Sequence, residues 1–347
     1  MRALVFEAYA GPLEVHDVWD PAPAPDGVVV RVEATGVCRS DWHAWQGHDP
    51  DVRLPHVPGH ELAGTVAAVG RDVRRWREGD RVTVPFVCAC GRCALCAAGE
   101  HQVCPHQTQP GFTHWGSFAE LVALDAADVN LVRLPDGLPS ATAASLGCRF
   151  ATAYRAVVQV GRVRPGEWVA VHGCGGVGLS AVQVAVAAGA RVVAVDVSPG
   201  ALELARSFGA EVGVDARAVG AVGGTADAVV EATRGGAAVS LDALGSPGTC
   251  EASVRSLRPR GRHVQVGLLP PGAGRAVVPM ERVIALELEV LGSHGMAAHA
   301  YDGMLGLVAA GRLRPDLLVT RELALADAAQ ALRDVGRQPG IAVVTAF

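Results

Sequence analysis

A glycine-rich turn between two apolar segments most restricts the folds open to this chain of 347 residues. Val169–His172 has the composition of a buried strand, and Val177–Ala188 has that of a helix. Between them, Gly173-Cys-Gly-Gly-Val-Gly178 follows the pattern G-x-G-x-x-G. Such a turn lets the backbone approach a pyrophosphate, whose charge is accepted by free N–H groups at the helix N-terminus. The sequence therefore predicts a dinucleotide-binding domain.

The alternation of strand, turn and helix continues over residues 151–292. Helical stretches such as Ala201–Phe208 separate the candidate strands. The candidate strands are Trp168–His172, Arg191–Asp196, Ala228–Glu231, Val239–Asp242, His263–Gly267 and Glu289–Gly292. This order predicts an α/β fold with a doubly wound parallel sheet. Residues 1–150 instead hold short β-type runs separated by Pro and Gly, and they predict a mostly β domain.

Asp196, at the end of the second candidate strand, bears on the choice of dinucleotide. Its carboxylate would accept hydrogen bonds from the adenosine ribose hydroxyls and would repel a 2′-phosphate. No Arg follows it directly in Val197-Ser198-Pro199, so NAD is favoured over NADP. The alternative is a glycine-rich packing turn with an aspartate on the surface.

Charge and composition argue against two classes of partner. The formal net charge is −5, which does not favour binding to nucleic acid. The longest apolar stretch, Trp168–Ala190, contains His172, Gln183 and several glycines, so it fits a strand, turn and helix better than a membrane span. We expect neither a nucleic-acid partner nor a membrane.

The nine cysteines are an odd number, and five of them lie between Cys88 and Cys104. This distribution favours metal ligation in a reducing, cytoplasmic setting over a disulfide framework. Four have the spacing of zinc ligands, Cys90-x2-Cys93-x2-Cys96-x7-Cys104. Four thiolates close a tetrahedral shell, so this zinc is expected to be structural. Cys88 is expected to be a spare thiol, and a zinc-ribbon interaction module is the competing interpretation.

A second set of metal donors is spread along the chain. Cys38, the pair His60-Glu61 and Cys148 supply two thiolates, an imidazole and a carboxylate. Two thiolates and one imidazole can hold a Zn²⁺ with one open position, where the metal lowers the pKa of a bound oxygen. Each residue alone could be a buried thiol or a core histidine. In combination they predict a catalytic zinc.

The glycine spacing in Gly59-His-Glu-Leu-Ala-Gly64 and on to Gly70 resembles the signature of the zinc-containing alcohol dehydrogenases, in the medium-chain dehydrogenase/reductase superfamily. The resemblance covers nearly the whole chain. It implies a GroES-like catalytic domain at 1–150, completed by 293–347, and a Rossmann domain at 151–292. It also implies a homotetramer that reversibly oxidises a primary or secondary alcohol to an aldehyde or ketone with NAD.

The resemblance also implies roles for single residues. Cys38, His60 and Cys148 would bind the catalytic zinc. Glu61 would lie just behind the metal or act as a transient fourth ligand, and Asp41, also behind the metal, would fix the tautomer of His60. Ser40 would pass the proton of the alcohol, through the nicotinamide ribose, to His43. The residues expected to contact the cofactor are Arg39, Thr152, Gly173, Gly175, Gly176, Val177, Gly178, Asp196, Val266 and Leu268.

Large apolar side chains suggest a hydrophobic substrate. Phe86 matches a position that lines the pocket in the family, and Trp42 and Trp115 are candidate additional walls. Cys148 stands where polyol-oxidising relatives often have Glu. One position departs from the family, because Gly340 is followed by Ile341 and not by an Arg that helps hold the pyrophosphate. We keep Arg337 as a hypothetical substitute.

Two other functions remain open on the sequence alone. One is a zinc-free quinone or enoyl reductase on the same scaffold, which would lack both sets of metal donors. The other is a non-catalytic dinucleotide-binding sensor, which would bind NADH without any alcohol-dependent signal. The content of zinc and an assay for NADH formation distinguish these from an alcohol dehydrogenase.

Overall fold

The computed structural model describes residues 1–220, 222–269 and 274–347, and the chain divides into two compact units. The first unit comprises Met1–Ala151, Gly295–Gly311 and Pro315–Phe347. The second comprises Thr152–His294 and Arg312–Arg314. The tail of the chain therefore returns to the unit in which the chain begins.

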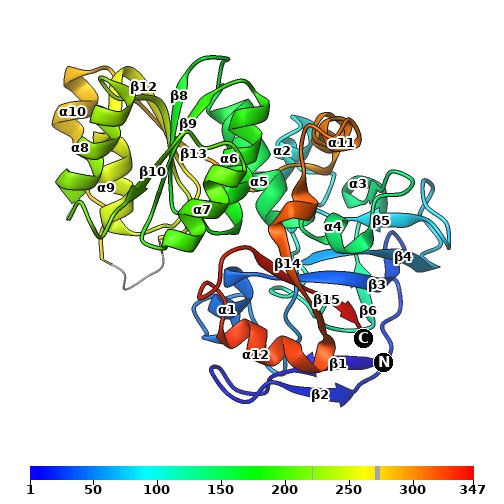
Figure 1. Cartoon of the computed structure of the whole chain (residues 1–347). Coiled ribbons are helices and arrows are strands. Elements are labelled where there is room, and N and C mark those ends of the chain that lie inside the picture. Colours follow the sequence, from blue (N-terminus) through cyan, green and yellow to red (C-terminus); the bar gives the residue numbers. More distant parts are fainter. Residues whose placement is uncertain (221, 270–273) are drawn as a thin grey trace. The chain divides into compact units, whose positions relative to one another are not determined.

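The second unit is built on a six-stranded sheet (Figure 1). The strand order is β10-β9-β8-β11-β12-β13, and every pairing along it is parallel. The order reverses between β8 and β11, as in dinucleotide-binding folds. The predicted doubly wound parallel sheet is confirmed. The strands are β8 (Trp168–His172), β9 (Arg191–Asp196), β10 (Val212–Asp215), β11 (Ala237–Asp242), β12 (Leu257–Gln265) and β13 (Glu289–Gly292).

Local sequence explains where the helices of this unit begin. The hydroxyl of Ser198 accepts a hydrogen bond from Ala201 N at the start of α7, and Pro199 lies in the first turn. Ser246 and Pro247 repeat this arrangement at α9. The helical segments are α5 (Ala151–Tyr154), η3 (Arg155–Val160), α6 (Gly176–Ala187), α7 (Pro199–Ser207), α8 (Val222–Thr233), α9 (Pro247–Arg255) and α10 (Met280–Ala285).

The prediction of a strand at Ala228–Glu231 is wrong, because these residues lie within α8. The buried positions of the helix include Ala226, Val229 and Thr233, which follow a helical and not an alternating spacing. A short apolar run such as Ala-Val-Val fits either structure when it is judged by itself. Strand β10, which the sequence did not predict, supplies the outer edge of the sheet instead.

The first unit is a mostly β structure with a seven-stranded sheet. The strand order is β14-β15-β3-β4-β5-β7, and β6 also pairs with β3, while β1 and β2 form a separate antiparallel pair. Because β15 pairs with β3, the last strand of the chain completes the sheet of the first unit. The strands are β1 (Arg2–Val5), β2 (Glu14–Asp17), β3 (Val28–Val37), β4 (Glu61–Val69), β5 (Arg81–Thr83), β6 (Leu121–Leu124), β7 (Val132–Arg133), β14 (Val319–Ala324) and β15 (Ile341–Ala346).

The helical segments of the first unit are short. They are α1 (Arg39–Trp45), α2 (Ala94–Ala97), η1 (His101–Val103), α3 (Ala127–Asn130), α4 (Ser140–Ala144), η2 (Leu146–Phe150), η4 (Ala298–Ala300), α11 (Tyr301–Ala309), η5 (Pro315–Leu318), η6 (Leu325–Asp327) and α12 (Ala328–Arg333). Apolar side chains of the sheet, such as Val30, Leu62 and Val82, form a buried cluster. Over the described residues, we find no helix with the length and apolarity that crossing a membrane requires.

The pairing of β3 with β4 positions the metal donors of the first unit. The register sets Gly36 opposite Glu61, so Cys38, just after β3, lies beside His60, just before β4. Gly64 faces the other strand so closely that a Cβ there would overlap the carbonyl oxygen of Arg31. The close approach of the two strands therefore depends on glycine at this position.

Gly64→Ala should destabilise the protein by about 1–3 kcal/mol, because the backbone of β3 must shift to make room. The measurement is the midpoint of thermal and urea unfolding followed by circular dichroism. Gly306→Ala is the control, since a Cβ in α11 meets no atom and alanine favours a helix by up to about 1 kcal/mol. Equal stability of the two variants would contradict the argument.

Candidate active site

Four potential metal ligands from three segments that are distant in sequence meet in the first unit. The donor atoms of Cys38, His60, Glu61 and Cys148 all lie within 4.8 Å of one another. Cys38 precedes α1, His60 lies just before β4, Glu61 begins β4, and Cys148 lies in the π-helical turn η2. The sheet thus brings together donors that the sequence separates by more than a hundred residues.

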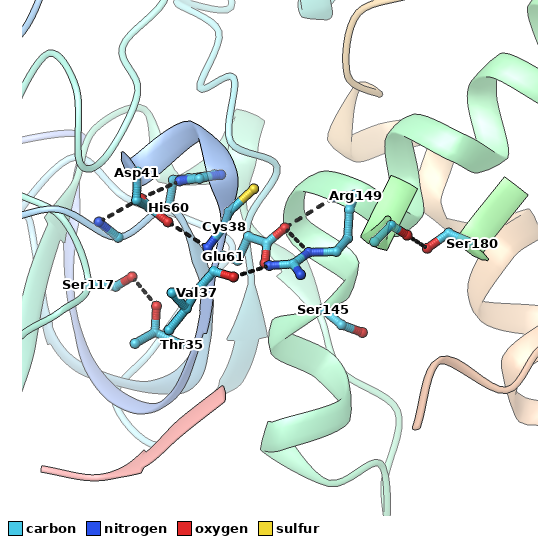
Figure 2. A network of polar contacts seen from close by, with 12 residues as sticks. Thr35, Val37, Cys38, Asp41, His60, Glu61, Ser117, Ser145, Arg149 and Ser180 are labelled. Atoms are coloured by element: carbon cyan, nitrogen blue, oxygen red, sulfur yellow. Dashed lines mark hydrogen bonds and ion pairs between the residues drawn. The ribbon is translucent and has the colours of Figure 1, made fainter. Parts of the chain in front are cut away.

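The buried carboxylate of Asp41 organises this group (Figure 2). Its Oδ1 lies 2.8 Å from Nδ1 of His60 and accepts a hydrogen bond of 3.0 Å from Gly59 N. Its Oδ2 accepts a bond of 3.0 Å from Cys38 N. One carboxylate therefore fixes the imidazole and the backbone of two of the three segments that carry ligands.

The imidazole of His60 fits a metal ligand. The bond to Asp41 takes up Nδ1, and Nε2 is buried without a hydrogen-bond partner. Burial alone lowers the pKa of His60, but the Asp41 carboxylate and the Cys38 thiol reverse this, and the pKa lies well above its ordinary value. A buried nitrogen without a partner is costly, and a cation at Nε2 would supply the missing interaction.

The two thiols of the site behave as a pair. A hydrogen bond between the side chains lowers the pKa of Cys38 well below its ordinary value and raises that of Cys148. Without a cation, the two sulfurs compete for a proton. Zn²⁺ prefers sulfur and nitrogen donors, and this set leaves a position open if Glu61 stays outside the shell. The residues present therefore fit a catalytic zinc.

Arg149 is a part of the site that sequence analysis missed. Its Nε donates a bond of 2.7 Å to Glu61 Oε1, and its Nη2 forms an ion pair with Oε2 of the same carboxylate. Both side chains are buried. Burial raises the pKa of Glu61, and the charge of Arg149 opposes this effect. A charged residue directly after a cysteine ligand, in an otherwise apolar run, was the available signal.

The cysteine-rich segment forms a second group of donors. The Sγ atoms of four cysteines lie close together. Cys93 Sγ is 3.4 Å from Cys96 Sγ and 3.8 Å from Cys104 Sγ, and Cys90 Sγ is 3.5 Å from Cys104 Sγ and 4.0 Å from Cys96 Sγ. Sulfurs about 2.3 Å from a tetrahedral zinc stand about 3.8 Å from each other. The four thiols therefore fit a closed structural zinc. The backbone N–H of Arg92 is the main cause that lowers the pKa of Cys90 to about 6.

Cys88 lies outside this group. Its Sγ donates to the carbonyl oxygen of Pro85 at 3.6 Å, and burial raises its pKa to about 12. No disulfide bridges it to another residue. It behaves as a spare buried thiol.

The glycine turn of the second unit is shaped for an anion. Gly173 has φ of +89°, and a Cβ on Gly178 would overlap the carbonyl oxygen of Gly173. No side chain caps α6, whose N-cap is Gly175, and a Cβ at Gly175 would meet only open space. The first N–H groups of α6 therefore lack a side-chain acceptor, which fits the pyrophosphate of a dinucleotide.

Asp196 lies at the end of β9, beside this turn. Its Oδ2 accepts a bond of 2.6 Å from Cys174 N, and its Oδ1 accepts one of 2.8 Å from Ser198 N. Arg217, which no sequence motif predicted, donates from Nη2 to the carbonyl oxygen of Val197. A guanidinium therefore binds the backbone of the residue that follows the carboxylate expected to bind ribose, although no Arg is adjacent in sequence.

The candidate proton path contains a histidine that sequence analysis left out. Nδ1 of His43 lies 2.9 Å from Nδ1 of His48, and the ring of Trp42 contacts both imidazoles edge-on. Burial, the charge of Arg39 and the proximity of His48 lower the pKa of His43. A neutral imidazole at this place can accept a proton near neutral pH.

Two aromatic rings flank His60 within the first unit. The centroid of Phe86 lies 6.2 Å from that of His60, and the buried ring of Phe112 lies 5.3 Å away. Phe86 was predicted to line the pocket, whereas Phe112 was not, because no motif distinguishes it from a core residue. The predicted wall Trp115 is partly exposed, and its Nε1 donates to the carbonyl oxygen of Pro55 at 3.1 Å.

The other residues predicted to contact the cofactor differ in their exposure and in their hydrogen-bond partners. Thr152 is buried and its hydroxyl has no partner, so it is free to bind a polar group. Leu268 is 62% exposed on the second unit. Arg337 is exposed and pairs with Asp334 at 2.8 Å, so its charge is partly taken up by its own turn.

The sequence of this chain is similar to those of known proteins with this fold. Residues 24–136 match the alcohol dehydrogenase GroES-like domain, and residues 176–310 match the zinc-binding dehydrogenase family. An alcohol dehydrogenase of Rhizobium meliloti (strain 1021) is 40% identical over 298 residues, which cover 84% of each chain. The chain belongs to the zinc-containing alcohol dehydrogenase family. The predicted family and the GroES-like half of the fold are confirmed.

Other relatives match nearly the full length of the chain. An alcohol dehydrogenase of Geobacillus stearothermophilus is 34% identical over 325 residues, or 93% of this chain and 92% of the relative. The structure of alcohol dehydrogenase TADH from Thermus sp. ATN1 superposes with a TM-score of 0.90 at 33% identity, covering 100% of both chains. The structure of the alcohol dehydrogenase from Aeropyrum pernix superposes with a TM-score of 0.89 at 31% identity, covering 99% of this chain and 100% of that chain.

Cys96→Ser should lower the zinc content of the purified dehydrogenase by one ion per chain, because its buried sulfur belongs to the closed group of four. Hydrogen exchange should rise in residues 90–104, since a metal-bound loop loses much of its order without the ion. Elemental analysis and hydrogen-exchange mass spectrometry measure the two effects. Cys88→Ser is the matched control, and an identical loss of zinc there would argue against the assignment.

Proposed function

We propose that the chain is an NAD-dependent alcohol dehydrogenase that interconverts a hydrophobic primary or secondary alcohol with its aldehyde or ketone. One observation carries the proposal. Two thiols and a buried imidazole with a free Nε2 converge on one point, and Asp41 fixes the imidazole and the backbone of Cys38 there. Donors of this kind with an open position are typical of a catalytic zinc.

Cys38, His60 and Cys148 would hold the metal. A zinc bound there supplies a Lewis acid that polarises the oxygen of the alcohol or carbonyl group. Asp41 keeps Nδ1 of His60 engaged, so only Nε2 is available to a ligand. Holding the imidazole in one tautomer and orientation raises its basicity and lowers the cost of assembling the site.

The glycine turn at the start of α6 would hold the pyrophosphate of NAD, which supplies the hydride acceptor. Asp196 favours NAD over NADP because a carboxylate repels a 2′-phosphate. Arg217 would favour NADP instead, because its positive charge would attract a 2′-phosphate. Its guanidinium binds the carbonyl oxygen of Val197, the residue after Asp196. The preference for NAD therefore depends on the charge of Asp196. Thr152, with its free buried hydroxyl, is proposed to contact the nicotinamide side.

The proton released on oxidation needs a path out of a buried site. Ser40, in the first turn of α1, is proposed to take it first, and His43, one turn later, to accept it next. His43 has a lowered pKa and is therefore neutral near pH 7. Alcohol oxidation thus requires the deprotonated form of His43.

The substrate class follows from the side chains next to the metal donors. Phe86 and Phe112 present aromatic rings to His60. Such surfaces favour an alcohol with an aliphatic or aromatic substituent over a polyol, whose hydroxyls would lose hydrogen bonds to water. Trp42 and Trp115 remain candidate walls of the pocket.

A homotetramer and a cytoplasmic setting are also part of the proposal. Strand β13 ends the sheet of the second unit, and apolar side chains of the same unit are exposed. They are Val277, Met280, Ile284 and Val290. An open strand edge beside apolar surface favours pairing with another copy of the chain. All nine cysteines are free thiols, which supports a reducing compartment.

The two other candidate functions are less well supported. A zinc-free quinone or enoyl reductase has no use for two compact groups of metal donors. A non-catalytic NADH sensor has no need of an open metal site beside a histidine pair. Alcohol-dependent formation of NADH by a protein that contains two zinc ions per chain would exclude both.

Cys38→Ala should reduce alcohol-dependent NADH formation to background, because the metal loses one of three ligands. The loss should exceed the ~10–100-fold that is typical for the removal of an outer-shell partner. Binding of NADH, followed by its fluorescence, should persist, since the glycine turn lies in the other unit. Full activity in a variant shown to lack the metal at this site would refute the mechanism.

His43→Gln should lower the rate of alcohol oxidation by about tenfold, less than the ~10²–10⁴ that a direct proton acceptor contributes. In the unmodified enzyme, the rate should fall as the pH decreases through the pKa of His43, which lies below its ordinary value. The variant should lack this inflection. His16→Gln, an exposed histidine on β2, is the control. The comparison is made on pH–rate profiles, and identical profiles for both variants would remove His43 from the path.

A further inference from the structure

Glu61 has two possible positions relative to a metal, and they have opposite consequences. Its carboxylate belongs to the same group within 4.8 Å as Cys38, His60 and Cys148. If it bound the metal, four protein ligands would close a tetrahedral shell and leave no place for substrate. If it stays back, the fourth position is open. The placement of one carboxylate therefore decides whether the site is structural or catalytic.

In the structure, Arg149 engages both oxygens of this carboxylate. Its side chain forms bonds to Oε1 at 2.7 Å and to Oε2, and its backbone N donates to Oε1 at 3.3 Å. Nη2 also donates to the carbonyl oxygen of Val37 at 3.0 Å. The guanidinium is thus fixed at both ends (Figure 2), and it is buried together with Glu61.

The backbone leaves room for this pair. Gly36 lies opposite Glu61 in the register of β3 and β4, and a Cβ there would overlap Glu61 Oε2. The same Cβ would lie 3.3 Å from Nη2 of Arg149. Glycine at position 36 therefore provides the space in which carboxylate and guanidinium meet.

Charge balance explains why Glu61 is paired with Arg149 and not with the metal. Two thiolates balance the charge of a Zn²⁺, and Arg149 balances Glu61, so each set is neutral by itself. Moving the carboxylate to the metal would leave Arg149 as an unpaired buried cation, which is costly. Removing Arg149 would instead leave the metal as the nearest cation available to Glu61.

We infer that Arg149 is a positioning residue that holds Glu61 out of the metal shell and so reserves the fourth position for substrate. This rests on the proposed function, because it requires zinc at Cys38, His60 and Cys148. Arg149 does not touch substrate in this account. It acts only through the carboxylate of Glu61.

The test uses the full chain with Co²⁺ in place of zinc, because the visible bands of cobalt report its ligands. Cys38→Ala, which retains only the cysteine-rich site, supplies the spectrum to subtract. The probe is imidazole, which enters an open position and shifts the bands. Arg149→Met should show an altered cobalt spectrum and an affinity for imidazole weaker by about 10–100-fold, because Glu61 competes for the position.

The double variant Arg149→Met/Glu61→Gln is the matched control. It lacks both the guanidinium and the competing carboxylate, so the affinity for imidazole should return to within about threefold of the unmodified protein, well inside the 10–100-fold effect. A defect of packing alone would not be rescued in this way. If Arg149→Met does not fold, Arg149→Lys replaces it, since a single ammonium should hold the carboxylate less completely.

Three outcomes separate the two proposals. Weak imidazole binding in the single variant and recovery in the double variant support the inference. Equal spectra and affinities in the unmodified protein and in the single variant overturn it, while the proposed function stands. Uptake of cobalt only at the cysteine-rich site in the unmodified protein overturns both, and this result needs no measurement of turnover.

Discussion

The buried carboxylate of Asp41 is the interaction on which the metal site depends. It binds His60 and the backbone N–H group of Gly59, so two hydrogen bonds join α1 to the residues just before β4. A third, from the backbone N–H group of Cys38, fixes the start of α1 itself. A buried anion is costly unless its oxygens are satisfied, and here both are. The same bonds that stabilise the charge orient the imidazole. Stability and metal binding therefore have a common origin in this unit.

The charged side chains around the site are paired. The Asp41 carboxylate accepts a hydrogen bond from His60, and Glu61 forms an ion pair with Arg149, while the two thiols are left for a divalent cation. In a buried setting, an uncompensated charge costs more than a poor fit of apolar groups. The Cys90–Cys104 group is built differently, because its four thiols come from one short loop and can enclose an ion without donors from distant segments.

Local patterns allowed much of this to be predicted from sequence. The spacing of Cys90, Cys93, Cys96 and Cys104 and the turn at Gly173–Gly178 are short, so their chemistry is encoded within a few residues. The predicted strand at Ala228–Glu231 failed for a related reason. A short apolar run fits a strand or a helix, and only packing against the rest of the sheet decides between them.

The sequence by itself determined which chemical groups are present, namely two sets of metal donors, a turn suited to pyrophosphate and an acid after the second strand. Only the tertiary structure decided how Glu61 is used, because its partner Arg149 is 88 positions away. Phe112 and His48 were likewise recognisable only from their neighbours. The physical reason is that a hydrogen bond or an ion pair extends over a few ångströms in space, and separation along the chain says nothing about that distance until the sheet has formed.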